Sequence, residues 1–321
     1  MTTSKDTSER RVSVVLHPVL PPGVKEQLGR IPTLELVCPD DDAGVAAALG
    51  QGAPILVTYT WRPEFLMPSL RLVAGTGAGY EQYPLELLRQ HHVVLTTGAG
   101  VNSACVAEHA FGLLLACTRR LGEAAVNQTE RRWAPLLGEE LAGKRLAIIG
   151  LGRIGEAIAV RAQGWDMEVR GLKRDVSAYA GVVSRVVGPA ELPQLCQWAD
   201  IAVLAAPAAA GEPPLIGSAE LDALGAGWLI NVGRGRLVDE EALVHALDEG
   251  QLRGAGLDVT ATEPLPVTSR LWDQPGVLLS AHNAGSGPGF GRRWIEIFRD
   301  NLAALNGSGD WRNQAPTLER T

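Results

Sequence analysis

Residues Lys144–Arg174, which read KRLAIIGLGRIGEAIAVRAQGWDMEVRGLKR, decide the fold. The apolar stretch Arg145–Ile149 is a strand candidate that runs into the loop GLGRIG (residues 150–155). An amphipathic helix opens from this loop, and a second strand candidate follows at Glu168–Leu172. A lone GxGxxG sequence is weak evidence, but the order strand, glycine loop, helix and strand predicts a dinucleotide-binding unit.

The glycines of the loop have distinct expected tasks. Gly150 allows the tight turn, Gly152 lets the backbone approach a pyrophosphate, and Gly155 lets helix and strand pack closely. The first helical turn, which includes Arg153 and Ile154, offers free N–H groups and a partial positive charge to phosphates. We therefore expect all five residues at the cofactor.

The end of the second strand bears on which nicotinamide cofactor binds. An acidic residue about 20 positions after the loop holds the ribose hydroxyls in NAD sites. Here Lys173 stands at that position, followed by Arg174, and both would attract a 2′-phosphate. The sequence therefore favours NADP(H), while Asp175, which could take the ribose-binding role, keeps NAD(H) open.

Short apolar runs alternate with helix-like segments on both sides of the loop. Further strand candidates are Val12–Leu16, Leu34–Cys38, Ile55–Tyr59, Leu70–Ala74, Val93–Thr96, Ile201–Ala205, Trp228–Asn231, Gly254–Asp258 and Val277–Ser280. Runs that are apolar on both faces are typical of parallel strands covered on both sides. The alternation predicts an α/β fold with two Rossmann-like or flavodoxin-like domains.

Helices are expected to start near Ile154, Pro189, Ala219 and Glu240, with Ser218 capping the third. The segment Ser103–Arg120 is apolar around most of its circumference, so we expect a buried helix at a domain junction. A last helix is expected at Arg292–Leu305 and would end at Asn306–Gly307. The first ten residues read as a disordered tail.

Size and composition narrow the class of protein. A chain of 321 residues suggests two domains, and its net charge of −7 disfavours a nucleic-acid partner. Neither a signal peptide nor an 18-residue apolar run is evident, so we expect no membrane partner. The four cysteines lack metal-ligand spacing, so we expect no metal site and a reducing, cytoplasmic location.

Three later segments carry chemically active side chains. They are INVGRGRLVDE (230–240), GLDVTATEPLP (256–266) and LSAHNAGS (279–286). Each follows or ends a strand candidate, and the carboxyl ends of parallel strands form the cofactor edge of such sheets. Together they bring an arginine, a glutamate and a histidine toward one edge.

With these segments in order, the chain resembles the D-isomer-specific 2-hydroxyacid dehydrogenase family from about residue 12 to about residue 315. The resemblance also includes GAGYE (77–81), GVN (100–102) and the Ala107–Glu108 helix start. It implies a glyoxylate- or hydroxypyruvate-type reductase that transfers a hydride from NAD(P)H to a small 2-keto acid and forms a D-2-hydroxy acid. It further implies a homodimer.

The resemblance assigns roles residue by residue. Arg234 matches the residue that binds the substrate carboxylate and carbonyl, and its planar fork suits both groups. His282 matches the general acid/base, and Glu263 matches the partner that orients and tunes it. Backbone N–H groups at Ala78 and Gly79 match a carboxylate-holding loop in the other domain.

Two more positions are implied at the cofactor. Asp258 matches a residue that orients the nicotinamide carboxamide. Pro207 matches a proline near the adenine, although the neighbouring stretch lacks the family's usual threonines. Ala281 and Asn283, beside the histidine, also depart from the family pattern and are expected to reshape its pocket.

The resemblance gives domain boundaries. Residues 103–286 are expected to form the dinucleotide-binding domain, and residues 1–102 with 287–321 the substrate-binding domain, with a cofactor cleft between them.

Three alternative functions remain open. One is a dehydrogenase acting on phosphite, which Ala78 disfavours, and another is a dehydrogenase acting on formate, which Glu263 disfavours. The third is a non-enzymatic, NAD(P)-sensing corepressor-like protein. The sequence does not identify the 2-keto acid or the physiological direction.

Overall fold

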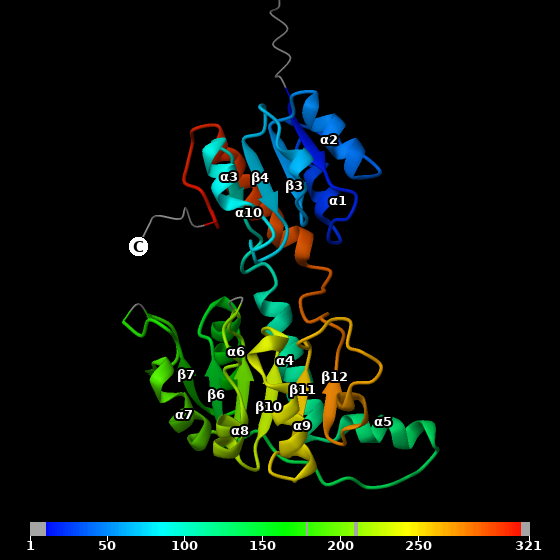
Figure 1. Ribbon diagram of the computed structural model, residues 1–321, viewed down its shortest axis with the longest axis vertical. Coiled ribbons are helices and arrows are strands. Elements are labelled where there is room, and N and C mark those ends of the chain that lie inside the picture. The colour runs from blue at the N-terminus through cyan, green and yellow to red at the C-terminus, as the bar shows by residue number, and fades with distance from the viewer. Residues whose placement is uncertain (1–10, 178, 209–210, 316–321) are drawn as a thin grey trace, which may run out of the picture. The chain divides into compact units, whose positions relative to one another are not determined.

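The computed structural model describes residues 11–177, 179–208 and 211–315, and these form two compact α/β units (Figure 1). Unit 1 joins the chain up to Asn102 with the chain from Gly287, and unit 2 is the continuous segment Ser103–Ser286. The expected N-terminal tail lies outside the described residues. Within the described chain, none of the helices has the length and apolar character needed to cross a membrane.

Unit 1 is built on a parallel sheet of five described strands in the order β2-β1-β3-β4-β5. The strands are β1 (Val12–Leu16), β2 (Leu34–Val37), β3 (Ile55–Thr58), β4 (Leu72–Gly75) and β5 (Val94–Thr96). The helices are α1 (Val24–Leu28), α2 (Asp42–Gly50), η1 (Pro63–Phe65), α3 (Leu85–Gln90) and α10 (Phe290–Leu305). This order is that of flavodoxin-like sheets.

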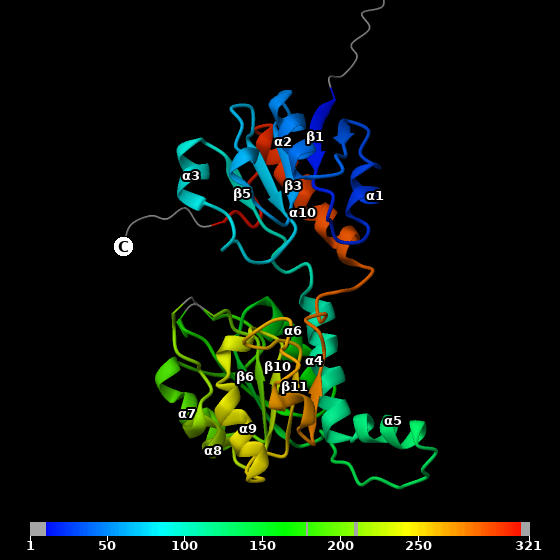
Figure 2. The ribbon, with the colours of Figure 1, turned by 45° about the vertical axis from the view of Figure 1, so that its right-hand side comes forward.

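Both faces of this sheet are covered, which explains the continuous apolar strands. Successive residues of β1, such as Val14 and Val15, enter two different cores. One core packs against α1 and α10, where Trp294 is 1% exposed, and the other against α2 and α3 (Figure 2). The alternation follows from side chains pointing to opposite faces of a strand.

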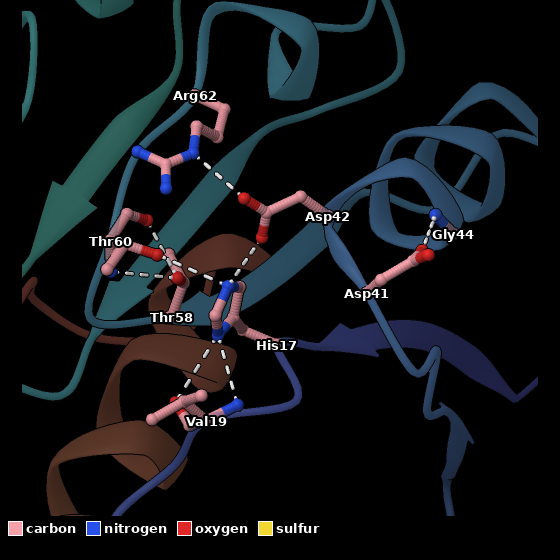
Figure 3. Close-up of polar contacts among 8 residues, drawn as sticks. All are labelled: His17, Val19, Asp41, Asp42, Gly44, Thr58, Thr60 and Arg62. Carbon is pink, nitrogen blue, oxygen red and sulfur yellow. Dashed lines mark hydrogen bonds and ion pairs between the residues drawn. The ribbon is translucent and has the colours of Figure 1, made fainter.

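A polar cluster ties together the carboxyl ends of β1 and β3 (Figure 3). The buried His17 ring places Nε2 2.9 Å from Asp42 Oδ1 and 3.2 Å from Thr60 Oγ1, and its Nδ1 accepts the Val19 N–H at 3.1 Å. Arg62 donates to the other Asp42 oxygen at 2.8 Å. The Arg62 guanidinium, and then His17, hold the pKa of the Asp42 carboxyl below its usual value.

Unit 2 contains a parallel sheet of seven described strands in the order β12-β11-β10-β9-β6-β7-β8. The strands are β6 (Arg145–Ile149), β7 (Glu168–Leu172), β8 (Arg185–Val187), β9 (Ile201–Leu204), β10 (Trp228–Asn231), β11 (Gly254–Leu257) and β12 (Val277–Leu279). The order reverses at β6 and β9, where a doubly wound sheet binds its ligand at the carboxyl edge.

Helices cover both faces of the second sheet. The described helices of unit 2 are α4 (Ser103–Thr118), α5 (Leu121–Thr129), α6 (Arg153–Gln163), η2 (Pro189–Glu191), α7 (Leu192–Trp198), α8 (Ser218–Leu224), η3 (Gly235–Leu237), α9 (Glu240–Asp248) and η4 (Arg270–Asp273). Helices α4 and α6 pack on one face, and α7, α8 and α9 on the other. The two parallel-sheet α/β domains that the sequence predicts are confirmed.

Several predicted boundaries need correction. Helix α8 is capped by Gly217 rather than Ser218, because Glu220 accepts the Gly217 N–H at 3.1 Å and Ser218 is already helical. Helix α4 stops at Thr118, two residues before the predicted end, since Arg120 has φ +55°. Helix α10 starts at Phe290, two residues before the predicted Arg292.

Candidate active site

The glycine loop has the geometry expected for close approach by a phosphate. Gly150 has φ +107°, and a Cβ there would lie 2.6 Å from the backbone nitrogen of Ala206. A Cβ on Gly155 would clash with the Gly150 carbonyl oxygen, so helix α6 packs directly on the loop. At Gly152 a Cβ would meet nothing within 4 Å. Space therefore lies open over the N-terminus of α6, the end of a helix where backbone N–H groups point outward and suit an anion.

A cavity of about 680 Å³ lies beside this loop. Five of the predicted cofactor residues line it: Gly150, Gly152, Lys173, Arg174 and Pro207. The predicted Arg153, Ile154 and Gly155 lie in the adjoining first turn of α6. The open glycine loop, the cavity size and the basic lining together suit a dinucleotide phosphate group.

The basic residues of this cavity do not behave alike. Lys173 Nζ donates to the carbonyl oxygen of Leu151 at 2.9 Å, so it braces the glycine loop. Arg174 is exposed at the cavity wall. Arg236, from η3, also lines the cavity, a position that sequence reasoning did not single out. The one sequence feature that could have pointed to Arg236 is its position two residues after Arg234.

His282 and Glu263 form a hydrogen-bonded pair at the carboxyl edge of the same sheet. The Nδ1 atom of His282 lies 2.6 Å from Glu263 Oε2, and Glu263 Oε1 accepts the Thr260 N–H at 3.1 Å. Glu263 is thus oriented by the backbone and in turn orients the imidazole. Among the described residues, Nε2 of His282 has no hydrogen-bond partner, which leaves it available for proton transfer.

The backbone at His282 is strained. Its φ is +49°, a conformation that costs a non-glycine residue about 1–3 kcal/mol. Its N–H donates to the Asp258 carbonyl oxygen at 2.8 Å. The Asp258 carboxylate, 2% exposed, accepts the N–H groups of Asn283 and Ala284, each at 3.0 Å. Asp258 therefore holds the turn that presents His282, a contact that sequence reasoning missed.

Arg234 sits on the loop after β10, with its side chain exposed. The buried Asn231 shapes this loop, since its amide donates to the Arg234 carbonyl at 3.0 Å and accepts the Gly233 N–H at 3.0 Å. Arg234 Nη1 donates to the Gly233 carbonyl at 2.8 Å. Asn231 lies in the predicted segment, but sequence reasoning gave it no role.

The loops that carry Arg234 and Glu263 pack against each other. A Cβ on Gly235 would clash with the Thr260 backbone, and Glu240 accepts the Ala261 N–H at 2.6 Å. A cavity of about 580 Å³ is lined by Asp258, Glu263, Trp272 and His282 among others. The arrangement can place a proton donor and an anion-binding guanidinium at one sheet edge.

In unit 1, Ala78 and Gly79 follow β4. Ala78 is exposed, and the Glu81 carboxylate packs so closely on Gly79 that a Cβ there would clash with it. Tyr83 supports this region: its Oη lies 3.0 Å from the Thr58 carbonyl, and burial raises its pKa well above the ordinary value. Tyr83 therefore supports the carboxyl edge of this sheet, next to a loop in which Ala78 is exposed.

Comparison with known proteins identifies the family. The family model described as D-isomer specific 2-hydroxyacid dehydrogenase, NAD binding domain, matches residues 111–284. A glyoxylate reductase from Korarchaeum cryptofilum is 33% identical over 249 residues, 74% of each chain. A glyoxylate/hydroxypyruvate reductase B from Enterobacter sp. is 30% identical over 312 residues, 92% of this chain and 95% of the relative.

Solved structures agree with the sequence matches. The NADPH-dependent glyoxylate/hydroxypyruvate reductase from Sinorhizobium meliloti, in complex with citrate, superimposes with a TM-score of 0.82 at 30% identity, covering 95% of this chain and 98% of that one. Since the family model spans more than half of the chain and the relatives most of it, the protein belongs to the D-isomer specific 2-hydroxyacid dehydrogenase family, as its motifs suggest.

Proposed function

We propose that this protein is an NAD(P)H-dependent reductase of a small 2-keto acid, of the glyoxylate or hydroxypyruvate type, that forms a D-2-hydroxy acid. The observation that carries the proposal is the His282–Glu263 pair at the sheet edge that also bears the glycine loop. Similar proteins named glyoxylate and glyoxylate/hydroxypyruvate reductases support it. They do not favour action on formate or phosphite, or a non-enzymatic sensing role.

Each proposed residue has a defined task. Reduced nicotinamide, when bound, supplies the hydride to the substrate's carbonyl carbon. Arg234 binds the carboxylate and polarises the carbonyl with its planar fork. His282, held through Nδ1 by Glu263, gives a proton from Nε2 to the carbonyl oxygen as negative charge develops there.

We propose two further contacts from the family resemblance. In unit 1, the backbone N–H groups of Ala78 and Gly79 bind the substrate carboxylate. In unit 2, Asp258 lies beside the His282 turn, where it would orient the nicotinamide carboxamide while its carboxylate oxygens hold that turn. Replacing Asp258 would therefore disturb the proton donor as well as the cofactor.

We propose that the preferred cofactor is NADP(H). The cavity beside the glycine loop is lined by Lys173, Arg174 and Arg236, which together outnumber its one carboxylate, Glu212. Cations attract the 2′-phosphate that distinguishes NADP from NAD. A neighbouring solved structure, the Sinorhizobium meliloti reductase, is described as NADPH-dependent and in complex with NADP.

Absorbance at 340 nm with purified protein tests the reaction and the cofactor together. Glyoxylate, hydroxypyruvate, pyruvate and a bulkier 2-keto acid are each supplied with NADPH and with NADH. We expect oxidation of NADPH by one of the first two acids, faster than oxidation of NADH. Cofactor binding without turnover on any 2-keto acid would contradict the proposed function, and faster turnover with NADH would contradict the cofactor preference alone.

We also propose that the protein is a homodimer, through the arm formed by α5 and residues 130–140 of unit 2. Figure 2 shows α5 extending from the rest of its unit. Trp133 is 98% exposed and Leu137 is 90% exposed, and exposed large apolar side chains gathered on one segment mark interaction surfaces. A second copy of this chain is the occupant that the family resemblance implies.

A cytoplasmic location is proposed on the state of the cysteines. Cys38, Cys105, Cys117 and Cys196 are all free thiols. Reduced cysteines are typical of proteins kept in a reducing compartment.

A further inference from the structure

His109, on the second turn of α4, reaches the carboxyl end of β12. Its Nε2 lies 2.8 Å from Ser280 Oγ, and Ser280 Oγ lies 2.6 Å from Asp258 Oδ1. Nε2 itself is 3.4 Å from the same carboxylate oxygen. The three side chains form a continuous chain from a helix on one face of the sheet to the turn that carries the proposed proton donor.

The direction of these hydrogen bonds follows from the chemistry of the groups. An ionised carboxylate can only accept, so Ser280 donates its hydroxyl proton to Asp258. Ser280 must then use a lone pair toward His109, so the imidazole donates from Nε2–H. With Ser280 donating to Asp258 and accepting from His109, these three side chains orient one another, and the arrangement fixes the position of the Asp258 carboxylate.

These hydrogen bonds lead from His109 to the turn that contains His282. Asp258 accepts the N–H groups of Asn283 and Ala284, the two residues that follow the strained His282. Because Asp258 is 2% exposed, its oxygens rely on protein donors, which are these two N–H groups and the Ser280 hydroxyl. The adjacent charge on α4, Glu108, is 69% exposed and paired with Arg161 of α6.

We propose that His109 is a positioning residue for His282. By donating to Ser280 it fixes the Asp258 carboxylate, and Asp258 keeps the turn in the conformation that presents the His282 ring. The inference rests on the proposed function for its kinetic consequence, but the structural link stands on the hydrogen bonds alone.

Two substitutions at one position separate the donor from the volume. His109→Leu removes the hydrogen bond, while His109→Gln retains an N–H donor near the position of Nε2. His245→Leu, on the exposed side of α9, is the matched control. The readouts are kcat and KM for the keto acid, NADPH affinity by fluorescence, thermal midpoint, and hydrogen exchange of the Asn283 and Ala284 amides.

We expect His109→Leu to lower kcat about tenfold or more at a temperature where it is fully folded, because displaced catalytic groups lose rate steeply. NADPH affinity should fall much less than kcat, since Asp258 itself and the glycine loop proposed to bind the cofactor phosphates are both retained. Exchange at Asn283 and Ala284 should speed up. His109→Gln should restore most of kcat and slow the exchange again, and His245→Leu should resemble the wild type.

Equal loss of kcat in both His109 variants, or a lower thermal midpoint with unchanged kcat and unchanged amide exchange, would overturn the proposal. Failure of the proposed function looks different. If the wild type reduces no 2-keto acid while His109→Leu still speeds exchange at Asn283 and Ala284, the reaction assignment fails and the positioning link stands.

Discussion

The side chain of His282 is 53% exposed, while its backbone is fixed by hydrogen bonds on either side of the strained φ. This combination suits proton transfer, because the ring is accessible to a substrate and is already held in one orientation. Glu263 orients the imidazole ring itself, because it bonds to Nδ1 and so leaves Nε2 to face the substrate. A histidine that merely filled a core would be buried with both ring nitrogens bonded, as His17 is.

The first residue-scale prediction concerns turnover. His282→Ala should lower kcat by roughly 10²–10⁴-fold, the range associated with a positioned acid/base, and leave NADPH binding intact. Glu263→Gln should have a smaller effect, since the amide oxygen can still accept from Nδ1–H. Steady-state kinetics with parallel fluorescence titration of NADPH measure both. Wild-type kcat in His282→Ala would remove this histidine from the mechanism.

A second residue-scale prediction separates two adjacent cations. Lys173→Met should weaken binding of both NADPH and NADH, because Lys173 braces the Leu151 carbonyl in the glycine loop. Arg174→Ala should weaken NADPH alone, by about tenfold for one lost charge-assisted contact to phosphate. Dissociation constants for both cofactors decide it, with Arg299→Ala in α10 as the control. If Arg174→Ala weakens both cofactors equally, it does not read the 2′-phosphate.

At the scale of elements, two glycines of the strand–loop–helix unit β6–α6 have different roles. One lets the helix pack on the loop, and the other leaves room for a cofactor to approach the loop. Gly155 lies against the Gly150 carbonyl, where a side chain has no room, whereas Gly152 faces open space. The two positions belong to the same motif but meet different surroundings. Substitutions at each should therefore fail in different ways.

We predict that Gly155→Val lowers the free energy of unfolding by about 1–3 kcal/mol, since α6 must move away from the loop. Gly152→Val should leave the thermal midpoint near that of the wild type and reduce cofactor affinity, because its side chain would fill the approach to the helix N-terminus. Thermal unfolding without cofactor and NADPH titration separate these effects. A large loss of stability in Gly152→Val would show that this position also serves packing.

Elements with continuous apolar runs were predictable, because burial on both faces is a local property of each strand. Strand β8 was missed: its three residues, Arg185–Val187, include a charged one and lie at the sheet edge. The roles of His109 and Asn231 could not be derived either, since their partners are set by packing rather than by local pattern. His109 meets Ser280, 171 residues away.

At the scale of the whole molecule, the dimer proposal makes a prediction about the arm. Trp133→Ala combined with Leu137→Ala should shift the protein toward monomer, because both apolar side chains are exposed on the isolated chain. Analytical ultracentrifugation over a range of concentrations measures the shift, with the exposed Val19→Ala in unit 1 as the control. A monomeric wild type, or a double variant that dimerises equally well, would refute the assigned surface.

The chain leaves unit 1 after Asn102 and returns to it at Gly287, so α10 follows all of unit 2 in the sequence although its Trp294 and Phe298 lie in the core of the first sheet. During synthesis, unit 2 is therefore complete while the sheet made first still lacks one of its covering helices. We expect a chain stopped after Ser286 to hold a protease-resistant unit 2 joined to a protease-sensitive N-terminal segment. The sheet of unit 1, which precedes unit 2 in the sequence, is thus completed only after unit 2 has been synthesised.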